Sequence, residues 1–302
     1  MAPLTSSIPV HTLDGRILLS VGSAVTPEAL ETLILSNPDA PYKSHNLMGH
    51  GTVRKDMREF VAAPPYDTIF SERERTAEIF GELEEVRLVG PALEMLDHFK
   101  QNDFYSYRHF LTVFLLSSSI ARELIPDHEN RGELAATGPV HDIGKVCVSP
   151  DIIEKTTPLT VSEKRALDDH TIAGYVLLCY HSRETGGLPA LIARDHHEKN
   201  DGSGYPQGII LSNLLVEIIA VSDVYDALLV PRPYRPTPYD NRTALEEIVE
   251  MATTGVFSWE TVKVLVSHNR SSRPAPDKTF IPTDRRGEPP KDNVYGKLVD
   301  DD

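Results

Sequence analysis

The stretch from His196 to Pro206, His-His-Glu-Lys-Asn-Asp-Gly-Ser-Gly-Tyr-Pro, constrains this chain more than any other. Its last six residues cannot continue a helix, because glycine permits positive φ while proline lacks an amide hydrogen and fixes φ. Consecutive side chains on a helix point about 100° apart, so His196 and His197 suit a metal cluster entered from two directions. We therefore expect a stiff loop that presents Tyr205 at the mouth of a site. The alternative is a helix end with two surface histidines.

The composition limits the classes of protein and partner. The 302 residues are enough for one large domain and a small one. With 30 Lys and Arg residues against 45 Asp and Glu residues, the net charge is −15, which argues against non-specific binding of duplex nucleic acid. A small anionic ligand stays compatible with this charge, because local cations and metal ions can invert the local field.

The cysteines and the apolar segments indicate an intracellular setting. Cys147 and Cys179 are too few for a disulfide framework or a cysteine-based zinc site, so we expect reduced core thiols. The N-terminus has no basic region followed by an apolar run, which predicts no signal peptide. The most apolar windows are too short, or too interrupted by charge, to span a bilayer. We expect a cytoplasmic protein without membrane insertion.

The sequence predicts a mostly α fold in three parts. Residues 1–66 are a small N-terminal α/β module and linker, residues 67–272 a helical bundle with lead-in helices, and residues 273–302 an extended or disordered tail. In the module, two short strands around an Asp-Gly turn precede a helix that begins at Pro27. Proline and glycine interrupt residues 38–66, so we expect a linker or surface excursion there.

Several predicted helices of the bundle carry candidate metal ligands. They are His109 in 105–125, His170 in the helix after a capping box at Thr160, His196 and His197 at the end of 188–197, and Asp223 in 214–229. A lone histidine such as His109 is most often a hydrogen-bonded core residue, and it becomes a ligand candidate only beside others. A carboxylate buried on an apolar helix is costly unless it is paired or binds metal, so Asp223 indicates a site.

The segment His141-Asp142-Ile143-Gly144-Lys145 adds two ligands and a cation. His141 offers a nitrogen, and Asp142 offers a carboxylate that can bridge two ions. Lys145 stands four residues after His141 and shares its face if the helix persists, where it could hold a phosphate without binding metal. The alternative is an ordinary helix C-terminus.

Together these candidates suit a dinuclear metal site. They are His109, His141, Asp142, His170, His196, His197 and Asp223. Seven nitrogen and oxygen ligands are too many for one zinc ion and suit two octahedral transition-metal ions inside a helical bundle. Arg232 and Arg235 follow on a proline-stiffened turn, where guanidinium groups suit phosphate or base contacts unless the turn is merely a solvated basic loop.

In the order and spacing of these motifs, residues 100–270 resemble the HD-GYP family, the metal-dependent phosphodiesterase branch of the HD superfamily. The matching pieces are His109 in its helix, His141–Lys145, His170, His196–Glu198, Asp201–Pro206, Val221–Leu228 and Arg232–Arg235. The resemblance implies an HD-type helical fold and hydrolysis of cyclic di-GMP to pGpG, with further hydrolysis to GMP left open. The attacking group would be a metal-activated hydroxide.

The resemblance also implies residue roles. One ion would be held by His109, His141, Asp142 and Asp223, and the other by Asp142, His170, His196 and His197. Lys145 would stabilise phosphate charge and protonate the leaving oxygen, while Arg232 and Arg235 would grip phosphates or guanines. Tyr205 would shape the entrance, and its loop would be a contact for GGDEF-domain cyclases. Iron and manganese are the first choices of metal, and a homodimer is left open.

The chain departs from the family pattern at a few positions. Members that hold a third metal place Glu four residues before the first ligand histidine, where this chain has Tyr105, so we expect two ions. Lys199 stands where the family usually has arginine, and Glu217 stands where a basic residue is common. Two alternatives stay open: a catalytically weak cyclic di-GMP receptor or interaction module, and a phosphodiesterase for another cyclic dinucleotide such as cyclic GMP-AMP.

Overall fold

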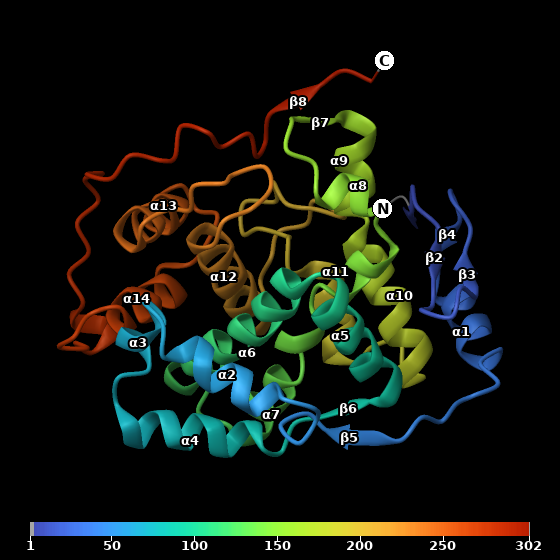
Figure 1. Cartoon of the computed structure of the whole chain (residues 1–302), viewed down its shortest axis with the longest axis horizontal. Coiled ribbons are helices and arrows are strands. Elements are labelled where there is room, and N and C mark those ends of the chain that lie inside the picture. The colour runs from blue at the N-terminus through green and yellow to red at the C-terminus, as the bar shows by residue number, and fades with distance from the viewer. Residues whose placement is uncertain (1–2, 302) are drawn as a thin grey trace.

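The computed structural model describes residues 3–301 and is predominantly helical, with a few two-stranded sheets at its periphery (Figure 1). Its α-helices are α1 (Pro27–Leu35), α2 (Val53–Val61), α3 (Tyr66–Ile69), α4 (Arg73–Leu83), α5 (Gly90–Asn102), α6 (Phe104–Leu124), α7 (His128–Ala135), α8 (Pro150–Ile153), α9 (Val161–Asp168), α10 (His170–Ser182), α11 (Leu188–Asp195), α12 (Leu214–Leu229), α13 (Asn241–Thr253) and α14 (Trp259–His268). The expected mostly α fold is confirmed.

Short strands and 3₁₀ turns complete the chain. The strands are β1 (Leu4–Thr5), β2 (Val10–His11), β3 (Ile17–Leu19), β4 (Ala24–Val25), β5 (Ser44–Asn46), β6 (Arg87–Val89), β7 (Leu159–Thr160) and β8 (Leu298–Val299). They pair as β1 with β4, β2 with β3 and β5 with β6, all antiparallel, and β7 with β8 in parallel. The 3₁₀ turns are η1 (Gly138–Val140), η2 (Ile143–Cys147) and η3 (Pro276–Lys278).

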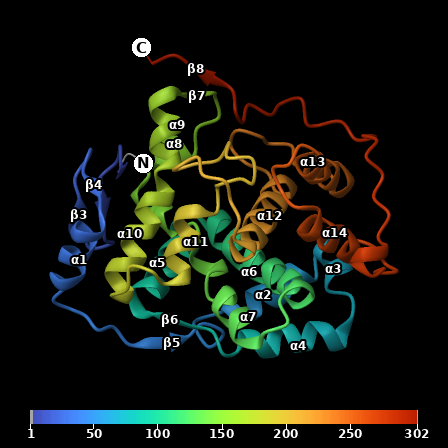
Figure 2. The same cartoon turned by 180° about the vertical axis from the view of Figure 1, so that it is seen from behind.

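Helix α6 is the axis of the bundle. Asp103 begins it by accepting a hydrogen bond from the Ser106 amide, and nearly every residue from there to Ala121 is buried. Helices α2, α5, α7, α12 and α14 all contact α6, while α10 packs against α11 and η2 (Figures 1 and 2). An apolar helix enclosed on all sides can carry a polar residue only where that residue has partners, which is the situation of His109.

The N-terminal module holds the expected β2–β3 hairpin and helix α1, together with a second pair, β1 with β4, that the sequence did not predict. Thr26 caps α1 by accepting from the Ala29 amide, and Pro27 takes the first helical position. Helix α1 packs on α10. At the other end of α10, both the amide and the hydroxyl of Ser7 donate to Asp169 Oδ2 at 2.5 Å. The module is therefore tied to the helix that begins at His170.

Residues 38–66 differ from the expected linker. Strand β5 pairs with β6, and α2 packs against α6. Val53 and Met57 are buried, and Phe60 packs against the same core, so they form an apolar stripe at helical spacing. The many prolines and glycines of the segment obscured that stripe, and the segment is part of the bundle's wall.

The helix expected to run into His141 also ends early. Helix α7 stops at Ala135, and Gly138-Pro139 starts a short 3₁₀ turn in its place. His141 and Asp142 then lie between η1 and η2. The C-terminal residues run extended over the surface and end in β8, consistent with the tail expected there (Figures 1 and 2). Within residues 3–301, no helix combines the length and apolar character that a bilayer crossing requires.

Candidate metal centre

The structure brings all seven candidate ligands to one place, where α6, η2, α10, α11 and α12 meet. They form two groups, His109 with His141, Asp142 and Asp223, and Asp142 with His170, His196 and His197. In each group the ligand atoms lie within 4.8 Å of one another. Asp142 belongs to both groups and lies at their junction.

The helix packing explains why these residues meet. His109 lies near the start of α6, and the contact between α6 and α12 places His109 Nε2 2.9 Å from Asp223 Oδ1. His170 begins α10, and His196 follows the last residue of α11. Because α10 and α11 pack closely together, the imidazole rings of His170 and His196 lie edge to face, with centroids 5.5 Å apart.

Two glycines set the distance between Asp142 and α10. A Cβ on Gly144 would lie 2.0 Å from the His170 carbonyl oxygen and 2.3 Å from the Gly174 amide nitrogen. The two backbones therefore touch where no side chain fits. This contact brings Asp142 Oδ1 to 2.9 Å from His170 Nε2 and 3.5 Å from His196 Nε2.

The two oxygens of Asp142 face different groups. Oδ1 points to His170 and His196, whereas Oδ2 lies 3.6 Å from His141 Nε2 and 3.8 Å from His109 Nε2. The ammonium group of Lys145 also donates to Oδ2. A carboxylate with one oxygen on each side is the arrangement a bridging ligand requires.

The hydrogen bonds of the histidines show that their free nitrogens point inward. Nδ1 of His141 lies 2.7 Å from the Gly138 carbonyl oxygen, Nδ1 of His170 lies 2.7 Å from that of Leu167, and Nδ1 of His196 lies 3.0 Å from two carbonyls of α11. Because a carbonyl can only accept, each Nδ1 carries the proton and each Nε2 carries a lone pair.

Those inward atoms lack partners. Nε2 of His141, His170 and His196 and Oδ1 of Asp142 are buried, and none makes a hydrogen bond within residues 3–301. Buried polar atoms are normally satisfied, so these four converging atoms, of which His170 Nε2 and Asp142 Oδ1 lie 2.9 Å apart, suit a cation between them. The donor set of imidazole nitrogens and carboxylate oxygens therefore fits divalent transition-metal ions on both sides of Asp142.

The protonation states of His141, His197 and Asp142 also suit metal binding, whereas at His109 the carboxylates of Asp223 and Asp226 outweigh burial and raise the pKa. Burial lowers the pKa of His141 to about 3, and burial together with the neighbouring His196 holds the pKa of His197 well below its ordinary value. Burial opposes ionisation of Asp142, but Lys145 and the adjacent histidines outweigh it and hold its pKa well below the usual range. These histidines are therefore neutral and Asp142 is ionised near pH 7, as metal ligands must be.

A carboxylate outside the ligand groups orients His109. Asp226 Oδ2 lies 2.6 Å from His109 Nδ1, while the hydroxyl of Tyr66 and Nη1 of Arg108, at 3.3 Å, donate to Oδ1. We did not assign this role from the sequence. The signal available was a second carboxylate one turn after Asp223 on a helix that is otherwise apolar.

The loop after the histidine pair has the expected stiffness. Glu198, fully buried, accepts from the amides of Gln207 at 2.6 Å and Ile209 at 3.0 Å. A Cβ on Gly204 would lie 2.4 Å from the His197 carbonyl oxygen, so the loop folds back on the ligand segment. Tyr205 stacks on the His197 ring at 4.6 Å. It thereby forms a wall beside the second ligand group.

The predicted substrate contacts fare differently. Arg232 lies over the ring of Tyr105 at 4.0 Å, and its charge interacts with Asp226 and Asp223. Arg235 is only 3% exposed, and its Nη2 donates to carbonyl oxygens of Ala227, Leu228 and Val230. That nitrogen closes the end of α12, because the chain turns back over the helix terminus, and the substrate contact expected of Arg235 stays a prediction.

Comparison with known proteins agrees with this geometry. A family model described as "HD domain" matches residues 87–257.

A cyclic di-GMP phosphodiesterase from Thermotoga maritima is 34% identical over 198 residues, which are 64% of this chain and 52% of that protein. The cyclic di-GMP phosphodiesterase response regulator RpfG of Xanthomonas campestris is 37% identical over 38% of this chain and 31% of its own length. A 3'3'-cGAMP-specific phosphodiesterase 3 from Vibrio cholerae is 36% identical over 47% of this chain and 31% of its own length. The chain thus spans about half of the first relative and about a third of the other two.

Proposed function

Because this chain belongs to the HD domain family, in the HD-GYP branch that its motifs resemble, we propose that it is a metal-dependent phosphodiesterase acting on a cyclic dinucleotide. Cyclic di-GMP is the first candidate substrate, since the relatives from Thermotoga and Xanthomonas are named as cyclic di-GMP phosphodiesterases. The observation that supports the proposal most directly is the convergence of unpartnered Nε2 atoms on the two sides of Asp142.

We propose two divalent transition-metal ions as cofactors, with iron or manganese as first choices. His109, His141, Asp142 and Asp223 would hold one, and Asp142, His170, His196 and His197 the other. When bound, such ions supply a water of lowered pKa and positive charge against the phosphate.

The chain's own residues supply positioning and charge. Asp142 fixes the spacing of the two sides through its separate oxygens. Lys145, beside Oδ2, is placed to offset charge on the substrate phosphate and to give its Nζ proton to the leaving oxygen. Arg232 is the first choice for a phosphate or guanine contact. Arg235 holds the same loop against the end of α12 through its hydrogen bonds to carbonyl oxygens there. Tyr205 borders the entrance.

With two ions the reaction we propose ends at pGpG. A second candidate substrate is 3'3'-cyclic GMP-AMP, because a relative from Vibrio carries that specificity in its name. Contact of the Tyr205 loop with a GGDEF-domain protein, and a homodimer, are further proposals that binding and mass measurements can test.

The experiment is hydrolysis by purified protein loaded with manganese or iron under exclusion of air. Cyclic di-GMP and 3'3'-cyclic GMP-AMP are incubated separately, and the nucleotides are resolved over time. We expect linear pGpG from the first, no product after chelation, and no product from an Asp142→Asn variant. Intact nucleotides alongside protein with two confirmed metal ions would contradict the proposal and favour a receptor.

A further inference from the structure

The last part of the chain, residues 284–301, lies across the loops above the bundle and is called the strap below (Figures 1 and 2). Near its start, the amides of Arg286 and Gly287 donate to Glu246 of α13 at 3.0 and 2.8 Å. Arg285 forms an ion pair with the neighbouring Glu247. The strap thus leaves α13 in a defined direction.

The middle of the strap is fixed to the arginine-bearing loop. Asp292 accepts from the hydroxyl of Thr237 at 2.9 Å and from its amide at 3.3 Å. The amide of Val294 donates to the Tyr234 carbonyl oxygen at 3.1 Å. The ring of Tyr295 lies against that of Tyr234, with centroids 5.4 Å apart.

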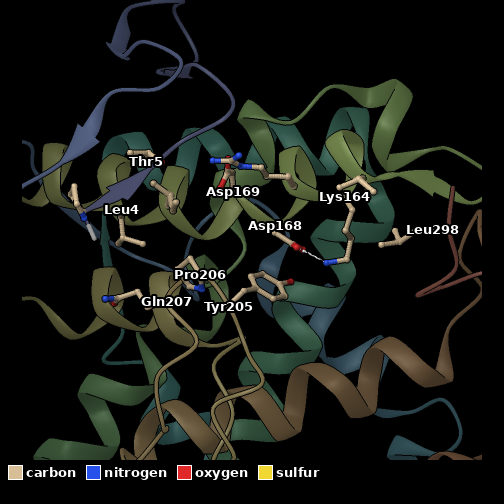
Figure 3. Close-up of a pocket in the computed structure, with 13 residues that line it drawn as sticks. Leu4, Thr5, Lys164, Asp168, Asp169, Tyr205, Pro206, Gln207 and Leu298 are labelled. Atoms are coloured by element: carbon tan, nitrogen blue, oxygen red, sulfur yellow. Dashed lines mark hydrogen bonds and ion pairs between the residues drawn. The ribbon is translucent and has the colours of Figure 1, made fainter. Parts of the chain in front are cut away.

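The end of the strap is fixed to α9. Leu298 and Val299 pair in parallel with β7, and Asp301 accepts from the amide of Ser162 at 3.1 Å and from its hydroxyl at 2.5 Å. Asp301 therefore caps the first turn of α9 from outside. In the close-up, Leu298 lies beside Lys164 on the wall that also includes Tyr205 (Figure 3).

These two attachments are made to segments that lead to different ligand groups. The loop with Tyr234 follows α12, which carries Asp223 of the first ligand group. Helix α9 leads within two residues to His170, which belongs to the second group. Leu298 of the strap lines the same pocket as Tyr205, which stacks on the ring of His197.

Tyr295 stands between the two attachments, and its ring lies against that of Tyr234. The pKa of Tyr205 is raised well above its ordinary value, first by burial and then by the nearby hydroxyl of Tyr295. The pKa of Tyr295 is raised too, by the protein packed around its hydroxyl and then by Tyr234, Asp168 and Asp223. These shifts agree with a position of the Tyr295 hydroxyl near Tyr205, although the residue as a whole is 57% exposed.

The strap is held weakly compared with the helices below it. Tyr295, Leu298 and Val299 are all about half exposed, so the strap buries little apolar surface. Its hydrogen bonds lie at the surface, where water competes for both partners. Segments of this kind detach locally without unfolding the core.

We propose that residues 284–301 are an autoinhibitory strap, in which Tyr295 closes the mouth of the metal centre and detachment of the strap admits the substrate. The identity of that substrate rests on the proposed function, whereas closure over the metal centre does not. Detachment of the strap precedes substrate binding, so only the detached fraction of the protein binds substrate. The attached strap therefore raises KM and leaves kcat, which reports the chemical step, unchanged.

The test removes one anchor from each attachment with Asp292→Ala and Asp301→Ala in a single protein. The matched control is Asp284→Ala with Asp300→Ala, which changes the same charge in the same segment at two exposed carboxylates that make no hydrogen bond or ion pair within residues 3–301. Amide hydrogen exchange at Val294, whose bond to the Tyr234 carbonyl neither substitution removes, reports detachment, and steady-state kinetics with cyclic di-GMP report access. We expect faster exchange and a KM lowered by roughly three- to tenfold at unchanged kcat in the anchor variant alone.

Faster exchange with an unchanged or higher KM would overturn the proposal, because the strap would then contribute nothing to closure or would help to bind substrate. Unchanged exchange would overturn it as well, since these carboxylates would not hold the strap. If even the unaltered protein hydrolyses no cyclic dinucleotide, the proposed function fails by itself. The strap is then judged by the rate at which a chelator removes bound metal. We expect faster removal from the anchor variant, and equal rates would exclude closure.

Discussion

Asp226 holds the ring of His109 from the side opposite the ligand group, with Oδ2 2.6 Å from Nδ1 while Nε2 of the same ring lies 2.9 Å from Asp223. The hydroxyl of Tyr66 and the guanidinium of Arg108 satisfy the other oxygen of Asp226. The orientation of the first ligand thus depends on a carboxylate that we do not propose as a ligand, and on a tyrosine at the end of the segment expected to be a linker.

Replacement of this carboxylate should weaken metal binding. Asp226→Asn keeps the shape of the side chain but removes the charge that fixes the His109 tautomer, so we expect metal affinity to fall by about 10- to 100-fold. Competition with a chromophoric chelator measures the affinity. Tyr66→Phe is the matched control and should cost much less, and unchanged affinity in Asp226→Asn would show that His109 needs no such support.

Removal of the shared ligand should have a larger effect. Asp142→Ala takes one oxygen from each ligand group, so we expect loss of both ions and loss of activity by at least about three orders of magnitude. Elemental analysis of the purified variant counts the ions. Tyr205→Phe should retain both ions, because its hydroxyl is not among the ligand atoms. An Asp142→Ala protein with full metal content and activity would refute the dinuclear arrangement.

The contact between Gly144 and α10 predicts a sharp difference between two glycines. In Gly144→Ala the new methyl group meets the backbone of His170 and Gly174, so we expect a loss of at least about 1–3 kcal/mol in the free energy of unfolding, together with weaker metal binding. Gly132 lies inside α7 with nothing within 4 Å of an added Cβ. Gly132→Ala should therefore stabilise the protein by about 0.5–1 kcal/mol through helix propensity. Denaturant titration measures both, and equal effects would contradict the packing described above.

The two arginines of the loop should separate binding from stability. Arg232→Ala leaves the loop's backbone bonds in place, so we expect a higher KM at nearly unchanged stability. Arg235→Ala leaves carbonyls at the end of α12 without their donor, so we expect a lower midpoint of thermal unfolding. Kinetics and thermal unfolding of both variants test this, and the reverse pattern would assign the substrate contact to Arg235.

A buried histidine remote from the metal centre predicts acid sensitivity. Burial lowers the pKa of His181 to about 4, whereas an unfolded chain holds it near about 6.5. The unfolded state therefore binds the extra proton first, and stability that is fully present above pH 6.5 is lost as the pH falls toward 4. Between pH 7.5 and 5.5 this histidine should cost on the order of 1 kcal/mol. His181→Phe, whose ring can keep the contacts with Tyr42 and Tyr180, should show a smaller loss by urea titration at the two pH values. Parallel losses in both proteins would contradict the assignment.

Much of the candidate ligand set could be predicted from the sequence, because several of these residues lie on or next to helices that the periodicity of apolar residues reveals. His109, Asp223 and the histidine pair each stand on or directly after a helix whose limits the structure reproduces closely. The capping box at Thr160 fixed the start of α9 in the same way. Local signals of this kind need no knowledge of what the helix packs against.

The features that were missed depend on contacts between distant segments. Tyr66 reaches Asp226 across 160 positions, and nothing near Tyr66 in the sequence indicates that partner. The turn that carries Asp142 is irregular because Gly144 touches α10, so Lys145 pairs with Asp142 and does not share a helical face with His141. The carbonyl partners of Arg235 could not be foreseen for a similar reason, since they are exposed only when the chain turns back over α12.

The bonds between Ser7 and Asp169 tie the N-terminal module directly to a segment of the metal centre. Asp169 precedes His170 directly, so a single peptide unit separates the residue that Ser7 grips from a ligand whose Nε2 lies 2.9 Å from Asp142. No further residue lies between Asp169 and His170, so a movement of Asp169 also moves His170. The described residues of the N-terminal module contribute no atom to either ligand group. The position of the module nevertheless helps to set the distance between His170 and Asp142 in the second group.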